Sequence, residues 1–170
     1  MPINIVSDTV SLLWRLHLYG HAVPAGLWKA TAAYAEPLFP KAGFAFANVH
    51  KAMLAAATAD RPAVEACAAA LTAVVEAGTL TAGSVVPAVC RAALAFAEEN
   101  FDKCARLLDS PADEAVRIGG SRAQREIVEA MLLVALMRSG QAAKARDLLD
   151  RRLHRRFSPR DDAWRSKLAA

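Results

Sequence analysis

Apolar residues recur at helical spacing along most of the chain, and glycine, proline or a short polar run interrupts them at intervals. Valine and isoleucine do not alternate with polar residues over any useful length, and no Asn-Gly or Asp-Gly hairpin turn occurs. The pattern therefore predicts an all-α fold. The expected helices span residues 7 or 8 to 19, 25–39, 44–59, 62–77, 84–98, 101–108, 122–139 and 142–155, with a short terminal helix within 158–168.

The turns between paired helices recur at a regular interval. They fall at Gly20, Asp60, Asn100 and Gly140, close to 40 residues apart, and Asp8 is expected to cap the first helix. Self-similarity at such a period is typical of arrays of helical hairpins. The sequence therefore predicts a single domain over residues 1–170, built from about four hairpins in a tetratricopeptide-like, right-handed stack.

The segments that follow these turns are also alike. AFAEENFDKCARLL superimposes on LMRSGQAAKARDLL with Ala105 on Ala145, and DRPAVEACAAAL fits the same frame with Ala66 at that position. Two helices approach closely where the residues at their crossing are small. We therefore expect these three alanines to lie at the hairpin crossings.

Composition supports a helical array. Apolar residues make up 55% of the 170 residues and aromatic residues only 6%, because alanine, the best helix former, is abundant. No apolar run reaches the ~18 residues of a membrane span, and the N-terminus lacks the pattern of a signal peptide. Cys67, Cys90 and Cys104 form no CxxC and fit packing positions in a reducing compartment. We expect a cytoplasmic protein, and the abundance of alanine and arginine favours a bacterial source.

Charge is concentrated near the C-terminus. From Lys144 to Lys167 there are nine basic and four acidic side chains, so this segment carries +5 and the rest of the chain −1. A basic tail can attract phosphate polymers. The tail, about residues 144–170, has no interleaved aromatic residues, and its charges sit at helix-surface spacing. A solvated helix face is therefore the preferred interpretation.

Three segments carry a family resemblance. RIGGSRAQREIVEAMLLVALMRSGQAAKARDLLDRRL, VSLLWRLHLYG and FAFANVHKAMLAAATADR together resemble the C-terminal part of the tetratricopeptide repeat protein 38 family. The most specific part is Ile-Gly-Gly-Ser at 118–121 followed by Ala-Gln-Arg at 123–125, while Arg122, Glu126 and Asn48 stand where the family has histidine, aspartate and aspartate. The resemblance implies a tetratricopeptide-like fold and no established activity.

The stretch RIGGSRAQRE, residues 117–126, is the most motif-like in the chain. Ser121-x-x-Gln124 predicts a capping box, and Gly119 and Gly120 permit a sharp entry into the helix with positive φ. These features need no ligand. The alternative is an anion site, in which exposed amides at the helix start act together with basic side chains. Those side chains are Arg117, Arg122 and Arg125, which could equally pair with Asp113, Glu114 or Glu126.

Histidines supply the other candidates. His50 falls on an apolar helix, where a partly buried histidine bonded to a neighbour is the expected role, and with Asn48 it ranks second as a site residue. His17 and His21 have the spacing of metal ligands on a helix, but no partner carboxylate or cysteine has an evident position. We therefore predict no metal site and no cofactor.

The segment SLLWRLHLY is apolar on nearly every side. A terminal helix of a solenoid should have a polar outer face, and a helix that is apolar all round is expected to be buried. Either later helices of the same chain cover it, or a partner does. The preferred expectation is a homodimer through this helix, with Leu12, Trp14 and Leu18 at the interface.

No nucleophile elbow, P-loop, dinucleotide fingerprint or zinc-protease motif occurs in the sequence. The preferred function is a non-catalytic scaffold or adaptor that binds a partner protein or an acidic peptide. Its groove would be lined by the first helix of each hairpin, His50 and the helix start at 119–125. The alternative is an enzyme or accessory subunit that binds an anionic small molecule in the same place. Nucleic-acid binding through the basic tail ranks last, and no membrane association is expected.

Overall fold

The computed structural model describes residues 2–38 and 42–168. Within these two ranges it contains helices and no strand, which confirms the all-α prediction. Short 3-10 helices occupy Glu36–Leu38 and Ala115–Ile118. The α-helices are α1 (Pro2–Leu18), α2 (Ala25–Ala35), α3 (Ala45–Ala57), α4 (Arg61–Glu76), α5 (Val85–Ala97), α6 (Phe101–Leu108), α7 (Arg122–Arg138), α8 (Ala142–Arg155) and α9 (Pro159–Lys167). No described helix is both long and apolar enough to cross a membrane.

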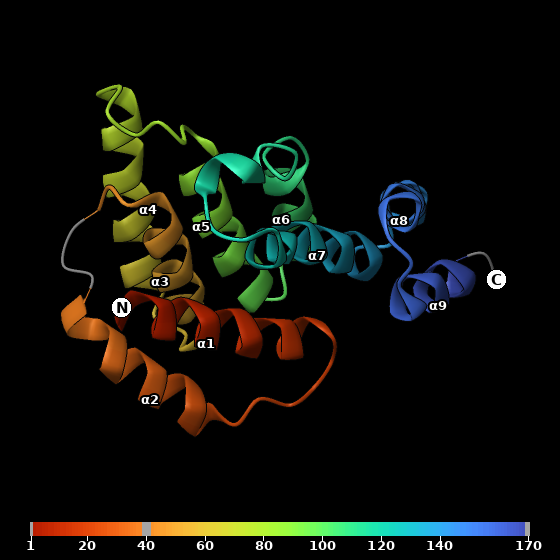
Figure 1. The fold of residues 1–170 in the computed structure, drawn as a ribbon, viewed down its shortest axis with the longest axis horizontal. Helices are drawn as coiled ribbons and strands as arrows, with labels where there is room; N and C mark the ends of the chain where they lie inside the picture. The colour runs from red at the N-terminus through yellow and green to blue at the C-terminus, as the bar shows by residue number, and fades with distance from the viewer. Residues whose placement is uncertain (1, 39–41, 169–170) are drawn as a thin grey trace.

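Successive helices pack as hairpins, α1 with α2, α3 with α4, α5 with α6 and α7 with α8 (Figure 1). Neighbouring hairpins are joined by packing of α3 and α4 on α5, and of α6 on α7. The N-terminal helix departs from a simple stack, because α1 packs against both α3 and α7. Helices α8 and α9 lie together at one end of the molecule (Figure 1).

The turns within the four hairpins share one geometry. Each contains a residue with positive φ. The backbone amide of the next residue donates a hydrogen bond to the carbonyl five residues before it, as in the Schellman motif that ends many helices. The positive-φ residues are Gly20 (82°), Ala59 (59°), Glu99 (57°) and Gly140 (75°). The returning bonds are His21 N to Leu16 O, Asp60 N to Ala55 O, Asn100 N to Ala95 O and Gln141 N to Leu136 O, each between 2.8 and 2.9 Å. The regular turns read from the sequence are therefore present.

The prediction that Ala66, Ala105 and Ala145 lie at the hairpin crossings holds for only two of these alanines. Ala105 and Ala145 are buried, but Ala66 is exposed on α4, so that part of the prediction is wrong. The three helices align structurally when they are counted from the residue that precedes each of them. These residues are Asp60 before α4, Asn100 before α6 and Gln141 before α8. Four residues after these positions, at Val64, Cys104 and Ala145, the side chains are fully buried.

Two predicted helix ends differ from the structure. Helix α1 begins at Pro2, so Asp8 lies inside it and is not an N-cap. Its carboxylate instead accepts a hydrogen bond from Gln124 Nε2 of α7 at 2.8 Å, a contact that sequence spacing does not show. Helix α2 ends at Ala35, and the predicted end near Phe39 and Pro40 lies outside the described residues.

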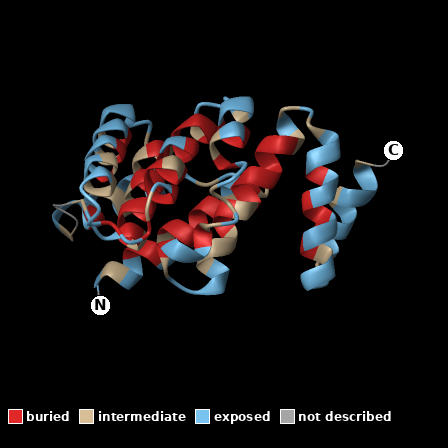
Figure 2. Cartoon of the chain, turned by 90° about the horizontal axis from the view of Figure 1, so that it is seen from above, coloured by how far each residue is buried: buried red, intermediate tan, exposed pale blue. Residues whose placement is uncertain are grey.

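The core is concentrated in α3, α5 and α7, and α1 covers it (Figure 2). Trp14 is fully buried, with its ring 6.2 Å from that of Trp28, and Leu18 is also buried. The prediction that these two residues form an interface with a partner is therefore wrong, because the same chain already covers them. Leu12 is 57% exposed and is the one predicted interface residue that remains on the surface.

Candidate functional site

The start of α7 forms the predicted capping box. Ser121 Oγ accepts a hydrogen bond from the Gln124 amide at 3.2 Å, and Gln124 Oε1 accepts one from the Ser121 amide at 2.8 Å. Gly119 and Gly120 have φ of 90° and 79°. A Cβ at Gly120 would lie 2.3 Å from Cε2 of Phe46, so this glycine also permits close contact with α3. The cap and the two glycines are explained without a ligand.

Helix α1 lies against this helix start. Gln124 donates a hydrogen bond from Nε2 to the carboxylate of Asp8, and Arg15 of α1 donates to the carbonyl of Ala123. The side chain of Arg125 bonds to the carbonyl of Gly120. The predicted groove between the first helices and the 119–125 segment is therefore largely filled by α1.

The three arginines of the predicted anion site have separate partners. Arg117 donates to Glu114 at 2.7 Å and to the carbonyl of Thr81 at 3.1 Å. Arg122 lies 3.5 Å from Glu126. The Arg117 guanidinium lies beside Gly83 in the turn before α5, whereas that of Arg125 turns back to the carbonyl of Gly120, so the structure does not bring all three guanidinium groups to one anion.

His50 is buried between α3 and α1. Its Nδ1 lies 2.7 Å from the carbonyl of Phe46, so this nitrogen is the donor, and its Nε2 accepts from Ser11 Oγ at 3.0 Å. Burial lowers the pKa of His50, which favours this neutral form. A serine that donates to a histidine resembles an activated nucleophile. However, Ser11 is only 2% exposed, and the space beside His50 and Arg125 is about 10 Å³, enough for one water at most.

Asn48 lies on a different face of α3 from His50. Its side-chain amide donates to the carbonyl of Phe44 at 2.8 Å, and its oxygens face the thiols of Cys67 and Cys90. Residues two apart on a helix do not share a face. The predicted pairing of Asn48 with His50 in one site is therefore wrong.

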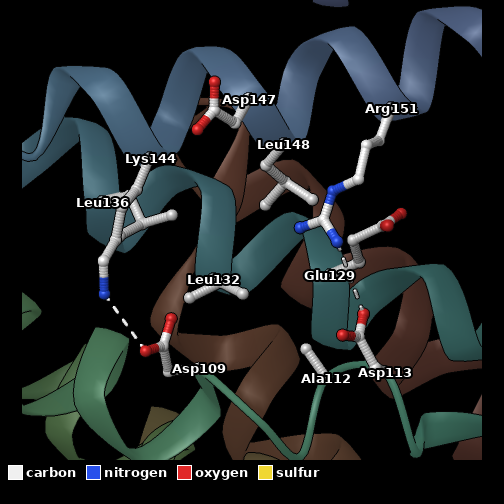
Figure 3. Close-up of a pocket in the computed structure, with 10 residues that line it drawn as sticks. All are labelled: Asp109, Ala112, Asp113, Glu129, Leu132, Leu136, Lys144, Asp147, Leu148 and Arg151. Atoms are coloured by element: carbon white, nitrogen blue, oxygen red, sulfur yellow. Dashed lines mark hydrogen bonds and ion pairs between the residues drawn. The ribbon is translucent and has the colours of Figure 1, made fainter.

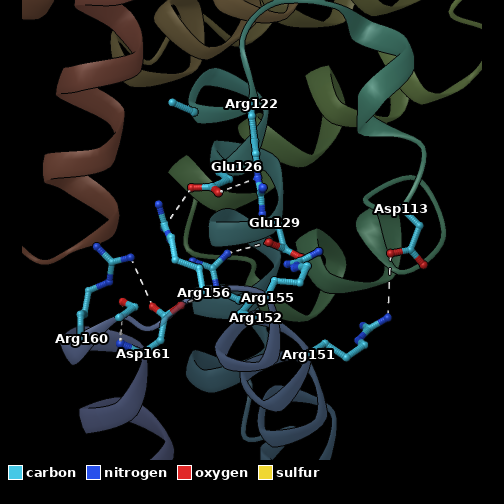
Figure 4. A network of polar contacts seen from close by, with 12 residues as sticks. Asp113, Arg122, Glu126, Glu129, Arg151, Arg152, Arg155, Arg156, Arg160 and Asp161 are labelled. Carbon is cyan, nitrogen blue, oxygen red and sulfur yellow. Dashed lines mark hydrogen bonds and ion pairs between the residues drawn. The ribbon is translucent and has the colours of Figure 1, made fainter.

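Most basic residues of the C-terminal segment are paired with acids. Arg152 is buried and contacts Asp161 of α9 at 2.7 Å and Glu129 of α7 at 2.8 Å (Figure 4). The pairs around this centre are Arg155 with Glu129, Arg156 with Glu126, Arg160 with Asp161 and Arg165 with Asp150. The basic charges therefore join α7, α8 and α9, in addition to covering a solvated helix face.

A groove lies between α8 and the connection that leads from α6 to α7 (Figure 3). Its volume is about 180 Å³, and its floor is formed by Leu132 and Leu136 of α7 and Leu148 of α8. Both walls carry charge (Figure 3). The charged lining residues are Asp109, Asp113, Glu129, Lys144, Asp147 and Arg151.

A second hollow adjoins this groove, because Ala112 and Glu129 line both. It measures about 130 Å³ and is bordered by Arg122, Arg125 and Arg155. Arg122 and Arg125 of the predicted site therefore border this hollow, and Arg125 also lines the small space beside His50. We call the two hollows together the α7–α8 groove. A separate hollow of about 250 Å³, lined mainly by alanines and Leu54, lies between α2, α3 and α4.

Most residues of the α7–α8 groove were not predicted as a site. A usable signal was the connection from Asp109 to Ser121, which is longer than the turns inside the hairpins. Long connections within compact domains are often functional. The side of α8 that faces this connection could not be read from its charge pattern alone.

The chain has no significant match to a protein-family model, a curated protein or a solved structure. The functional interpretation therefore rests on the geometry of the α7–α8 groove.

Proposed function

We propose that this protein is a helical-repeat interaction module that binds an extended segment of a partner protein in the α7–α8 groove. The observation that carries the proposal is the combination of a leucine floor with charged walls along one continuous hollow. Apolar contacts supply binding energy, whereas charged groups at the rim fix orientation and select the partner.

The ion pairs that cross the groove can be replaced by ion pairs with a bound partner. Lys144 of α8 lies 3.1 Å from Asp109, and Arg151 lies 3.9 Å from Asp113 (Figure 3). All four side chains are more than half exposed, and such surface pairs contribute about 0–1 kcal/mol each. A partner can replace them with its own charges at little cost.

The charges of the groove also give it a direction. One end holds Asp109, Asp113 and Asp147 with Lys144 and Arg151, a net charge of −1, and the other holds Arg122, Arg125 and Arg155 with Glu126 and Glu129, a net charge of +1. A bound segment would place its acidic group at the arginine end and a basic group at the aspartate end. This refines the acidic peptide expected from the sequence into a segment with charges of both signs.

A tetratricopeptide-like arrangement is part of the same proposal. It is supported by the four hairpins, whose turns share one hydrogen-bond geometry and recur every 39 to 41 residues, at Gly20, Ala59, Glu99 and Gly140. The packing of α1 on α7 is a departure from an open stack. Since α1 fills the inner face, the free recognition surface is displaced to α7 and α8.

Site-specific photo-crosslinking in the native cell tests the proposal. A photoreactive residue replaces Asp147 at the groove, and a control replaces Arg106 on α6, which is exposed and lies outside the groove. The expected result is one protein crosslinked from position 147 and not from position 106, with the crosslink confined to one segment. A synthetic peptide of that segment should bind the purified protein, and Arg122→Glu, at the arginine end that receives the acidic group of the segment, should weaken its binding at least tenfold.

The matched charge reversal is Arg106→Glu, which should leave peptide affinity unchanged. Equal crosslinking from both positions would contradict the proposal, as would a peptide that binds wild type and Arg122→Glu equally. The alternative of an anionic small molecule at His50 has less support, because the space there is about 10 Å³.

A further inference from the structure

Two cysteines from different helices meet at Asn48. The Sγ atom of Cys67 on α4 lies 3.7 Å from Asn48 Oδ1 and 4.0 Å from the Asn48 carbonyl oxygen. The Sγ atom of Cys90 on α5 lies 3.9 Å from the same carbonyl oxygen. Three helices therefore bring two thiols to one acceptor, although the cysteines are far apart in sequence.

The two thiols have unequal environments. Cys67 is partly exposed, and a hydrogen bond from the Cys90 thiol lowers its pKa, with a smaller contribution from the charge of Lys51. Cys90 is fully buried, and the hydrogen bond to Cys67 together with burial raises its pKa. Cys67 is therefore the better nucleophile, while Cys90 stays protonated beside it.

We propose that Cys67 and Cys90 form a peroxide-sensitive dithiol whose oxidation to a disulfide joins α4 to α5. This inference is independent of the α7–α8 groove. The Cys67 thiolate attacks a hydroperoxide, so the O–O bond breaks, an S–O bond forms, and alkoxide or hydroxide leaves and takes up a proton. The Cys90 sulfur then attacks the sulfenic acid of Cys67, and an S–S bond forms as water leaves with the Cys90 proton. The dithiol loses two electrons and the peroxide gains them.

The third cysteine supplies an internal comparison. Cys104 on α6 is buried, and burial raises its pKa to about 12. It has neither the exposure nor the second thiol that the reaction needs. A general sensitivity of cysteines to peroxide would affect all three, whereas the proposed site should react at Cys67 and Cys90 alone.

Mass spectrometry tests the proposal on the full chain. The reduced protein is titrated with hydrogen peroxide, free thiols are blocked with N-ethylmaleimide, and the product is digested. Both cysteines lie in one tryptic peptide, residues 52–91, because proline follows Arg61. The expected product is this peptide without N-ethylmaleimide and two hydrogen atoms lighter. Cleavage after Glu76 should then yield fragments that stay joined until they are reduced.

Single variants define the order of events. Cys90→Ser should allow dimedone to trap a sulfenic acid at Cys67, and Cys67→Ser should slow oxidation of position 90 at least tenfold. Cys104→Ser should behave as wild type. Oxidation of Cys67 to sulfinic acid without a disulfide, disulfides only between chains, or reaction of Cys104 at the same rate would each overturn the proposal. The wild-type titration decides the matter even if a variant does not fold.

Discussion

Arg152 of α8 and Asp161 of α9 form a buried ion pair, with 2.7 Å between Nε and Oδ2 and side chains that are 5% and 2% exposed. Arg152 also contacts Glu129 of α7 at 2.8 Å, and Arg160 contacts the second oxygen of Asp161 at 3.3 Å (Figure 4). One arginine therefore joins three helices at the C-terminal end of the molecule. Because both side chains are buried, breaking this ion pair should cost more free energy than breaking the exposed ion pairs around it.

Asp161→Asn should lower the free energy of unfolding by about 3 kcal/mol. Removing one partner of a buried ion pair leaves the other charge without full compensation, which typically costs several kcal/mol, and Glu129 limits the loss here. Chemical denaturation measures the change. Asp162→Asn is the matched control, since Asp162 lies in the same first turn of α9 but is exposed. An equal loss of unfolding free energy in both variants would show that the buried ion pair stabilises the protein no more than an exposed carboxylate does.

Stability should fall as the pH drops below about 6.5. Burial lowers the pKa of His50 in the folded protein, so the unfolded chain binds more protons and acid favours unfolding. The loss begins near the unfolded pKa of about 6.5 and continues until the folded pKa is passed, at no more than about 1.4 kcal/mol per pH unit for this group.

Unfolding free energies measured between pH 5 and 8 test this dependence on His50. The charged groups that act on it are Asp8 and Arg15, both on α1. His50→Gln should reduce the slope, whereas His21→Gln, at an exposed position, should not. His17, whose pKa burial also lowers, should retain its own contribution. An unchanged slope in His50→Gln would contradict the prediction.

Gly120→Ala should destabilise the protein more than Gly119→Ala. Both residues have positive φ, which costs a non-glycine residue roughly 1–2 kcal/mol. At Gly120 the added Cβ would also lie 2.3 Å from the ring of Phe46, which packs on His50, whereas the position at Gly119 is open. Thermal or chemical unfolding of the two variants gives the comparison directly. A larger loss for Gly119→Ala would rule out the contact with Phe46 as the reason.

Gln124→Glu should destabilise the junction of α1 and α7 by about 0.5–1 kcal/mol at neutral pH. The amide that now donates to Asp8 would become a second carboxylate beside it. Asp8→Asn should restore stability in that background, because an asparagine amide can donate to the glutamate, and a double-mutant cycle measures the coupling. Gln141→Glu, at the start of α8, should be neutral or stabilising because helix starts favour acidic side chains.

Local features of this chain were readable from its residues. The capping box of Ser121 and Gln124 and the turns at Gly20 and Gly140 depend on atoms within about five residues of one another. Such interactions form whenever the local sequence permits them, so their signals survive without knowledge of the rest of the fold.

Contacts between distant helices were not readable in the same way. The bond between Asp8 and Gln124 joins residues 116 positions apart, and the burial of Trp14 depends on which helices later cover α1. The expectation of a partner at Trp14 and Leu18 was wrong for this reason. An apolar face shows that something must cover it, and only packing decides whether the cover comes from the same chain.

The sequence by itself determined an all-α chain with hairpin turns about 40 residues apart and a capped start to α7. Only the tertiary structure decided that α1 fills the predicted groove, that Asn48 faces two cysteines, and that the open groove lies beside α8. The physical reason is the distance along the chain over which each interaction acts. Helix propensity and capping act between neighbours, whereas the faces that meet are selected by the packing of the whole chain.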